Sequence, residues 1–405
     1  MELGFVFKSG AKNFEKIRNL FSTYPIMPDI ILLVSLEVPR ACAGEQAKSG
    51  DRLPEISSKY FMTMGVLVTQ RESNPYPYSD SNKRYMTYDW YMKRRFGGKA
   101  ARIALDIGCT CPNIDGTRGT GGCIFCKNGS SSAMGESLDE QFEHGKDIAR
   151  RKWKVAGFVP YFQAHTNTWG DPALLSAAYN HAAVWKDVLM IALATRPDSI
   201  SEELTGSLVR LARKVPLIVE FGLQTSNDKT AARINRCHTW AEFCAGYEKL
   251  RAAADKVNAE CRDELPADGR EIPGLRMKRF QIGVHLIDGL PGEDAEDMLR
   301  TARDTAALRP DMVKIHLLHV LEGTQLAKLY ESGDYEPMSR EDYVRVVADQ
   351  LELLPPDAVI GRVTGDAAEN ELLAPDWCVK KTIVANEIDK ELYRRNSWQG
   401  RRFCI

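Results

Sequence analysis

Six apolar runs that alternate with helical patterns constrain the fold of this 405-residue chain more than any other feature. Each run is short and is followed by a longer segment with helical periodicity. Ser137 and Glu140, for example, have capping-box spacing at the start of one such segment. Alternation at this spacing predicts parallel strands with helices packed outside them. The expected strands are residues 102–108, 157–164, 188–195, 217–224, 280–289 and 312–320.

An open or partial barrel is the natural closure of such units. We expect an α/β fold, a partial (β/α)6 TIM-like barrel over residues 75–335 with a leading helix, and a helical C-terminal extension over 336–405. Residues 1–74 lack the strand–helix rhythm, so we expect a poorly ordered extension or a start codon assigned too early. In such barrels the chemistry collects at the C-terminal ends of the strands.

A basic and aromatic segment, residues 83–99, precedes the first strand and ends at Gly97-Gly98, which predicts a helix. Lys and Arg interleaved with rings suit phosphates and bases, so a nucleic-acid patch is one interpretation. The other interpretation, which we favour, is an amphipathic helix docked on the barrel.

Charge and cysteine content limit the classes of function. A formal net charge of −1 gives no global basic field for nucleic acid. Ten unevenly clustered cysteines favour a metal or redox site in a reducing cytoplasm over a disulfide scaffold. The most apolar segment, residues 26–39, is too short to span a bilayer and is bracketed by Asp29 and Glu37, so we expect no membrane association.

Four of the cysteines lie in one glycine-rich loop, CTCPNIDGTRGTGGCIFC, residues 109–126. Because the loop follows the first strand, it is expected at the mouth of the barrel. A zinc ribbon would use all four thiols, although Cys109-x-Cys111 is tight for such a site. An iron–sulfur cluster accepts looser spacing. A redox pair formed by Cys123 and Cys126 would instead need a helix N-terminus.

The stretch CPNIDGTRGTGGCIFC, residues 111–126, resembles the cluster loop of the YhcC-like subfamily of bacterial radical S-adenosylmethionine (SAM) proteins, whose substrate is unassigned. Ordered matches run from about Tyr76 to Gly400 and include YFQAHTNT, FGLQTSNDKTAARINRCH, HLIDGLPGE and RNSWQG. More remotely, the chain is similar to the radical SAM domain of the elongator catalytic subunit and to oxygen-independent coproporphyrinogen dehydrogenase. The resemblance implies the radical SAM form of the partial barrel.

The resemblance also implies a [4Fe-4S] cluster held by three thiolates, those of Cys111, Cys123 and Cys126. We expect the chain to turn at Gly108, so that Cys109 points away as a neighbour and not a ligand. The fourth iron would stay open to the amino and carboxylate groups of SAM. Reductive cleavage of SAM would then give a 5′-deoxyadenosyl radical that abstracts hydrogen from an unknown substrate. An external electron donor of the flavodoxin or ferredoxin type is expected.

Further matches imply which residues contact SAM. The segment 161–168 lies where many relatives have a glycine-rich turn, and it keeps only the threonine spacing. Arg196 follows the third strand, where related enzymes often place a glutamate. Gln224 and Arg236 match positions that reach SAM in coproporphyrinogen dehydrogenase, and His285 stands where a ribose-binding aspartate can occur. The implied contacts are Gln163, Thr166, Thr168, Arg196, Gln224, Arg236, His285 and Gly289.

Three residues on the expected strands are candidates for catalysis: Glu220, Lys314 and His316. A strand glutamate is costly to bury unless it is paired, so a site role and a salt-bridged structural role both stay open for Glu220. Lys314 and His316 share one face of a strand and would position substrate or manage protons, unless they are buried structural residues. Two alternatives stay open for the whole chain: an RNA-modifying radical SAM enzyme, and a non-catalytic zinc-binding nucleic-acid or scaffold protein.

Overall fold

The computed structural model describes residues 74–404, except for 128–136, 262–263 and 366–369. The chain divides into two units, Met1–Ser73 and Asn74–Ile405, and the second is described below. The predicted extension over residues 1–74 lies, apart from its last residue, outside the described residues. The expected boundary at residue 335 falls between α9, Gln325–Glu331, and α10, Arg340–Leu353.

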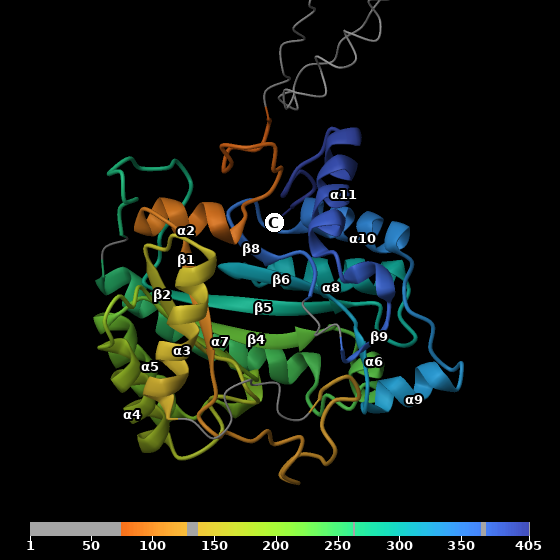
Figure 1. Cartoon of the computed structure of the whole chain (residues 1–405), viewed down its shortest axis with the longest axis horizontal. Helices are drawn as coiled ribbons and strands as arrows, with labels where there is room; N and C mark the ends of the chain where they lie inside the picture. Colours follow the sequence, from red (N-terminus) through yellow and green to blue (C-terminus); the bar gives the residue numbers. More distant parts are fainter. Residues whose placement is uncertain (1–73, 128–136, 262–263, 366–369, 405) are drawn as a thin grey trace, which may run out of the picture. The chain divides into compact units, whose positions relative to one another are not determined.

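Seven parallel strands form one curved sheet in the order β1-β2-β3-β4-β5-β6-β8 (Figure 1). They are β1 Ala100–Leu105, β2 Gly157–Phe162, β3 Ile191–Thr195, β4 Leu217–Gln224, β5 Phe280–Asp288, β6 Met312–Leu317 and β8 Val359–Arg362. The predicted partial barrel is confirmed, and all six expected strands occur. The seventh, β8, comes from the predicted helical extension and was missed, because four residues carry too little periodicity to distinguish a strand.

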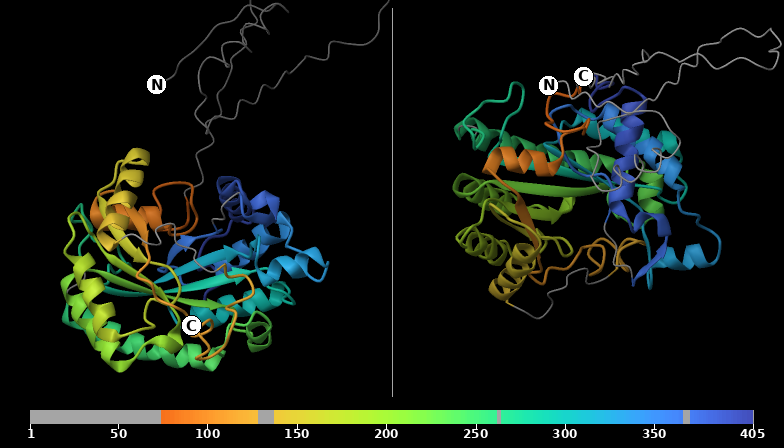
Figure 2. Two further views of the ribbon diagram at one scale, coloured as in Figure 1. Left: turned by 60° about the horizontal axis from the view of Figure 1, so that its bottom comes forward. Right: turned by 45° about the horizontal axis from the view of Figure 1, so that its top comes forward.

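Helices cover the outer face of the sheet and bury apolar side chains against it (Figure 2). Ser137 and Glu140 form the expected capping box at the first of them, and Thr239 and Glu242 form another. No helix within the described ranges is long and apolar enough to cross a membrane. The helices that follow strands are α3 Leu138–Lys152, α4 Pro172–Ala183, α5 Glu202–Lys214, α7 Trp240–Glu260 and α8 Ala295–Ala307, with α10 before β8.

Smaller elements complete the described part of the chain. Two short strands, β7 and β9, pair antiparallel apart from the main sheet, and α11 packs on α10. Their bounds, with those of the remaining helices, are β7 Val320–Leu321, β9 Leu372–Ala374, α6 Asp228–Arg233, α11 Lys381–Arg394 and the single-turn helices Pro197–Ser199 and Asp376–Cys378.

The segment before β1 closes one end of the inner face. Helix α2, Tyr88–Phe96, begins after Thr87, whose side chain accepts from Trp90 N, and it ends at Gly97 in the left-handed conformation. The interpretation of residues 83–99 as an amphipathic helix docked on the barrel is therefore confirmed, and the C-terminal ends of the strands stay available for a site. Its buried side chains pack with the first halves of the strands, at Ala100, Val159, Ala192, Ile218, Met312 and Val359.

Candidate active site

The cysteine loop, residues 109–126, follows β1 and folds back on itself. Ile114 N donates to Cys111 O (2.7 Å), which closes a turn directly after the first cysteines. Gly122 N donates to Asn113 O (2.9 Å), which brings the second pair of cysteines back beside the first. Gly122 has a φ of 73°, a conformation that a residue with a side chain would resist.

Three thiols of this loop share one electrostatic environment. Burial raises the pKa of Cys123 to about 12, and the sulfurs of Cys126 and Cys111 add to the rise. Burial and the Cys111 sulfur likewise raise the pKa of Cys126. Within the part of the chain that the structure describes, no three His, Cys, Asp or Glu side chains form a ready-made metal site. The donors nevertheless fit a cluster, because one loop supplies three thiols and the Cys111 sulfur lies close enough to Cys123 and Cys126 to affect the ionisation of both.

Cys109 lies apart from these three thiols. Gly108, with a φ of 73°, turns the chain at the end of β1, as expected. Cys109 packs against the hydrophobic core beneath the outer helices. Burial and the nearby carboxyl of Asp106 raise the pKa of its thiol to about 11, and the thiol also lies near the ring of Tyr179. Cys109 and Cys111 therefore face different surroundings although one residue separates them.

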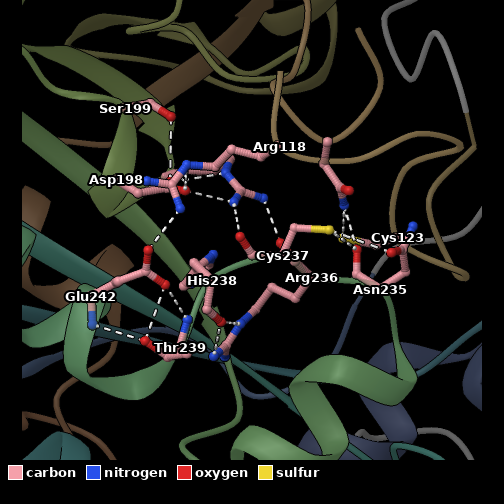
Figure 3. Close-up of polar contacts among 12 residues, drawn as sticks. Arg118, Cys123, Asp198, Ser199, Asn235, Arg236, Cys237, His238, Thr239 and Glu242 are labelled. Atoms are coloured by element: carbon pink, nitrogen blue, oxygen red, sulfur yellow. Dashed lines mark hydrogen bonds and ion pairs between the residues drawn. The ribbon is translucent and has the colours of Figure 1, made fainter. Parts of the chain in front are cut away.

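Ion pairs hold the loop to the ends of β3 and α7 (Figure 3). Arg118 of the loop donates to Glu242 Oε1 (2.7 Å) and pairs with Asp198 Oδ2 (3.2 Å). Arg196 donates to both oxygens of the same Asp198, at 3.0 and 2.8 Å. Burial opposes the charge of Arg196, but Asp198 and the nearby thiols outweigh burial and raise its pKa. Arg196 is therefore a fixed positive charge beside the cysteines.

Two asparagines that the sequence analysis did not single out connect the loop to the segment after α6. Asn113 is fully buried, and its Nδ2 donates to Cys123 Sγ at 3.5 Å and to Asn235 O. Asn235 in turn donates from Nδ2 to Gly122 O (2.8 Å). Both asparagines lie inside family-like stretches, CPNIDG and RINRCH, and those stretches were the available signal.

Arg236 is enclosed by backbone carbonyls. Its side chain is 1% exposed, and Nε and Nη2 donate to His238 O at 3.1 and 2.8 Å. Its Nη1 donates to Leu223 O and Thr225 O, while burial lowers the pKa of the guanidinium to about 10. Gln224 lies between those two carbonyls at a bulge in β4, with a φ of 63°. Strain of this kind collects at functional sites, but contact of either residue with SAM stays a prediction.

The segment after β2 contacts both the cysteine loop and β3. Thr166 N donates to Thr110 O of the loop (3.2 Å), and Thr168 Oγ1 lies 2.5 Å from Thr195 Oγ1. Both threonines of this segment are buried, whereas Gln163 is exposed. Of the predicted SAM residues that follow β2, Thr166 therefore contacts the loop and Thr168 contacts the end of β3.

Glu220 lies at the centre of a charged cluster on the inner face. It is fully buried and pairs with Arg102 Nη1 (2.6 Å), Lys314 Nζ (2.5 Å) and His285 Nε2 (2.9 Å). Burial opposes its ionisation, but Arg102 and Lys314 outweigh burial and hold the pKa of Glu220 well below its usual range. Burial and then Arg102 lower the pKa of Lys314 to about 7. Burial and then Lys314 lower the pKa of His285 to about 4. Two catalytic candidates and one SAM candidate thus meet in one cluster.

His316 and Gly289 complete the predicted set. The rings of His316 and His285 lie 5.4 Å apart and are tilted by 34°, which places His316 beside the Glu220 cluster. Burial and then the charge of Arg362 lower the pKa of His316 well below its usual value. Gly289, with a φ of 84°, accepts from the hydroxyl of Tyr335 (2.9 Å). The structure therefore joins His316 to the cluster and places Gly289 against the segment that precedes α10.

Known proteins share both the sequence and the architecture of this chain. Residues 310–394 match the family model described as the Radical_SAM C-terminal domain. The chain is 38% identical over 336 residues to the protein YtqA of Bacillus subtilis, a match that covers 82% of this chain and 97% of that protein. It is 30% identical over 305 residues to the protein YhcC of Escherichia coli, covering 74% of this chain and 90% of YhcC.

A solved structure supports the fold independently. The archaeal Elp3 of Methanocaldococcus infernus, with an N-terminal deletion, superposes with a TM-score of 0.53 at 16% identity, over 74% of this chain and 64% of that one. At that identity the likeness concerns the fold alone. The near full-length matches to YtqA and YhcC, on a partial barrel with a cysteine loop after its first strand, decide the family. The chain belongs to the YhcC-like family of radical SAM proteins.

Proposed function

We propose that this chain is a radical SAM enzyme that binds a [4Fe-4S] cluster through Cys111, Cys123 and Cys126. The division of the loop's thiols carries the proposal: these three share one environment, whereas Cys109 packs on the core. Three thiolates leave one iron of a four-iron cluster without a protein ligand, open to SAM. When bound, the cluster would supply the electron that cleaves a carbon–sulfur bond of SAM and so starts hydrogen abstraction from a substrate.

The chain's own residues would hold and tune this group. Asn113 donates an N–H to the Cys123 sulfur, and Arg196 sets a positive charge beside the thiols, so thiolate charge is balanced inside a partly buried loop. Because burial raises the pKa of Cys123 to about 12, a metal must displace its proton, and assembly of the site should release protons.

The SAM site is proposed around the same loop. Arg236 binds the carbonyls on both sides of Gln224, so we assign it the task of holding Gln224 in its strained conformation as well as a SAM contact. An electron donor of the flavodoxin or ferredoxin type and a cytoplasmic location belong to the same proposal. The proposed SAM contacts are Gln163, Thr166, Thr168, Arg196, Gln224, Arg236, His285 and Gly289.

The two alternative functions gain little support. The RNA-modifying alternative drew on the cations of α2, but Arg94 pairs with Asp268 (2.9 Å), and Arg95 pairs with Glu264 (2.8 Å). A helix whose cations are neutralised in this way does not favour an RNA surface. The zinc alternative needs four thiols at one site, and the position of Cys109 against the core argues against that arrangement.

Single-cysteine variants purified without oxygen test the proposal. Cys111→Ala, Cys123→Ala and Cys126→Ala should each lose most of the bound iron and sulfide, because alanine has no ligand atom. Cys109→Ala is the matched control and should keep both, together with SAM-dependent formation of 5′-deoxyadenosine. Colourless zinc in the parent chain, or a loss of metal in the control as complete as in the other three, would overturn the assignment.

A further inference from the structure

A charged layer crosses the inner face of the sheet because one strand offers no side chain there. Glu220 on β4 and Lys314 on β6 belong to strands that are separated by β5. In register, Glu220 lies beside Gly283 of β5 and Lys314 lies beside His285, two residues further along, and the two side chains meet across β5 at 2.5 Å. A Cβ at position 283 would lie 3.2 Å from Glu220 Cγ and 3.1 Å from the Cε of Met312. The glycine therefore makes room for the ion pair.

This layer holds more cations than carboxylates. Arg102 and Lys314 share the single carboxylate of Glu220. Both cations also face the ring of Tyr161, at 4.9 and 4.7 Å from its centroid. Arg362 of β8 lies beside Lys314 in register and adds to the positive potential that lowers the pKa of Lys314 to about 7. An added anion would relieve this excess, because it offsets cation–cation repulsion in a poorly solvated place.

Above the charged layer the inner face is accessible to solvent. The inward positions nearest the strand ends are small or polar, in contrast to the aromatic residues at the other end. His316 has a buried Nε2 with no hydrogen-bond partner among the described residues. A buried polar nitrogen without a partner is costly, so this atom is suited to a group that arrives with a ligand. The partly or fully exposed inward residues are Ala104, Gln163, Ala194, Gly222, His285 and His316.

We propose that this surface, formed by Lys314 and His316 above Glu220 and flanked by His285, binds an anionic group of the substrate, either a carboxylate or a phosphate. The inference rests on the proposed function for the existence of a substrate and adds its chemical class. The small residues at 104, 194 and 222 leave space for the uncharged part of that molecule beside the cysteine loop. His316 Nε2 has no partner among the described residues and donates to the anion in the tautomer that carries the proton there, while Lys314 supplies the charge.

Histidine resonances report directly on this surface. The chain has seven histidines, and labelling their Cε1 carbons gives one signal for each. The signals of His316 and His285 are assigned by their loss in His316→Gln and His285→Gln. Inorganic phosphate and, separately, acetate are titrated at constant ionic strength into the chain purified without oxygen. Both signals should shift and saturate together with at least one probe, and the probe that binds more tightly identifies the class of anion.

Variants decide whether His316 itself holds the anion. In His316→Leu, which removes the ring donor at similar size, the affinity read from the His285 signal should fall roughly tenfold. His316→Gln keeps an N–H donor and should retain most of the affinity, and His144→Gln on the exposed face of α3 should match the parent.

Two outcomes would overturn the inference: a His316 signal that drifts without saturating, as the His144 signal does, or an unchanged affinity in His316→Leu. The measurement needs no SAM cleavage. Its failure is therefore distinct from loss of the proposed function, which the cysteine variants report.

Discussion

Two buried carboxyl groups on β4 and β5 show how a single residue's surroundings set its charge. Burial disfavours the ionised form of both. Arg102 and Lys314 outweigh burial at Glu220 and keep that group ionised. Asp288 has a hydrogen bond from Gln350 Nε2 (2.7 Å) in place of a cation, and burial raises its pKa to about 7. Glu220 is therefore suited to a charged site, whereas Asp288 behaves as a neutral group that joins β5 to α10.

Asp288 should make the folded protein less stable as pH rises. An unfolded aspartate ionises near pH 4, whereas Asp288 in the folded protein keeps its proton up to about pH 7. The contribution of Asp288 to the free energy of unfolding is therefore complete below pH 4 and decreases between pH 4 and pH 7. Asp288→Asn cannot ionise, so it should gain unfolding free energy over the parent from pH 5 to pH 8, by about 4 kcal/mol at most. Urea unfolding at both pH values measures this. Asp255→Asn on the exposed side of α7 is the control, and an equal change in both variants would contradict the assignment.

Alanine variants of Gln224 and Arg236 should distinguish a loss of SAM binding from a loss of fold stability. Gln224→Ala removes a half-buried side chain at the end of β4, so SAM affinity should fall about tenfold, about 1.5 kcal/mol, with the thermal midpoint unchanged. Arg236→Ala leaves the carbonyls of Leu223, Thr225 and His238 without their donors, so it should lower both SAM affinity and the thermal midpoint. Calorimetric titration of iron-replete variants with SAM tests both. Unchanged affinity in Gln224→Ala would remove it from the SAM site.

At the scale of elements, the cysteine loop depends on one glycine, Gly119, that packs against the side chains of Asn113 and Cys237. A Cβ at Gly119 would lie 2.7 Å from Asn113 Oδ1 and 2.7 Å from Cys237 Sγ. Asn113 is held by Cys123 and Asn235, so it cannot yield without moving a proposed ligand. The loop is thus closely packed where Gly119 meets Asn113 and Cys237, although it has no regular secondary structure.

Gly119→Ala should therefore lower the bound iron by several fold, because the added methyl displaces Asn113 and with it the Cys123 sulfur. Gly206→Ala in α5 is the matched control: the added methyl would meet only the flexible Arg210 side chain, at 3.5 Å, and the iron content should equal the parent's. Iron and acid-labile sulfide per chain give the measurement. Full iron occupancy in Gly119→Ala would show that the loop tolerates displacement at Asn113.

At the scale of the whole molecule, the unit that begins at Asn74 contains its own core. Tyr76 and Tyr78 pack edge to face at 5.7 Å and belong to the cluster that closes the inner face. The hydroxyl of Tyr76 donates to Pro356 O (2.9 Å), so the start of this unit is tied to the segment before β8. The fold therefore needs these tyrosines.

A chain that starts at Met64 should keep the iron content and thermal midpoint of the full protein. A chain that starts at Met86 loses both tyrosines and should unfold at a clearly lower temperature, because burying an aromatic side chain contributes about 3–5 kcal/mol. Thermal unfolding with iron analysis of the three chains tests this. If the chain that starts at Met64 loses its cluster or its solubility, residues 1–63 belong to the working protein.

The sequence by itself determined the features that depend on near neighbours. Strand and helix alternation, the capping box at Ser137 and the turn at Gly108 are local patterns, and each occurs as expected. Cys109 packs against the core, whereas the ligand role of Cys111, Cys123 and Cys126 stays a prediction. Capping boxes, turns and strand–helix alternation can be predicted from the sequence because a few adjacent residues determine the local backbone geometry.

Only the tertiary structure decided which distant residues meet. Glu220 and Lys314 are 94 positions apart, and they pair because β4 and β6 flank β5, with Glu220 beside Gly283 and Lys314 beside His285. Asn113 reaches Asn235 across 122 positions, and β8 becomes a strand only because β6 offers it an edge. Whether a buried charge is paired, and whether a four-residue segment such as β8 forms a strand, depends on partners that no local pattern names, because burial and register are properties of the assembled sheet.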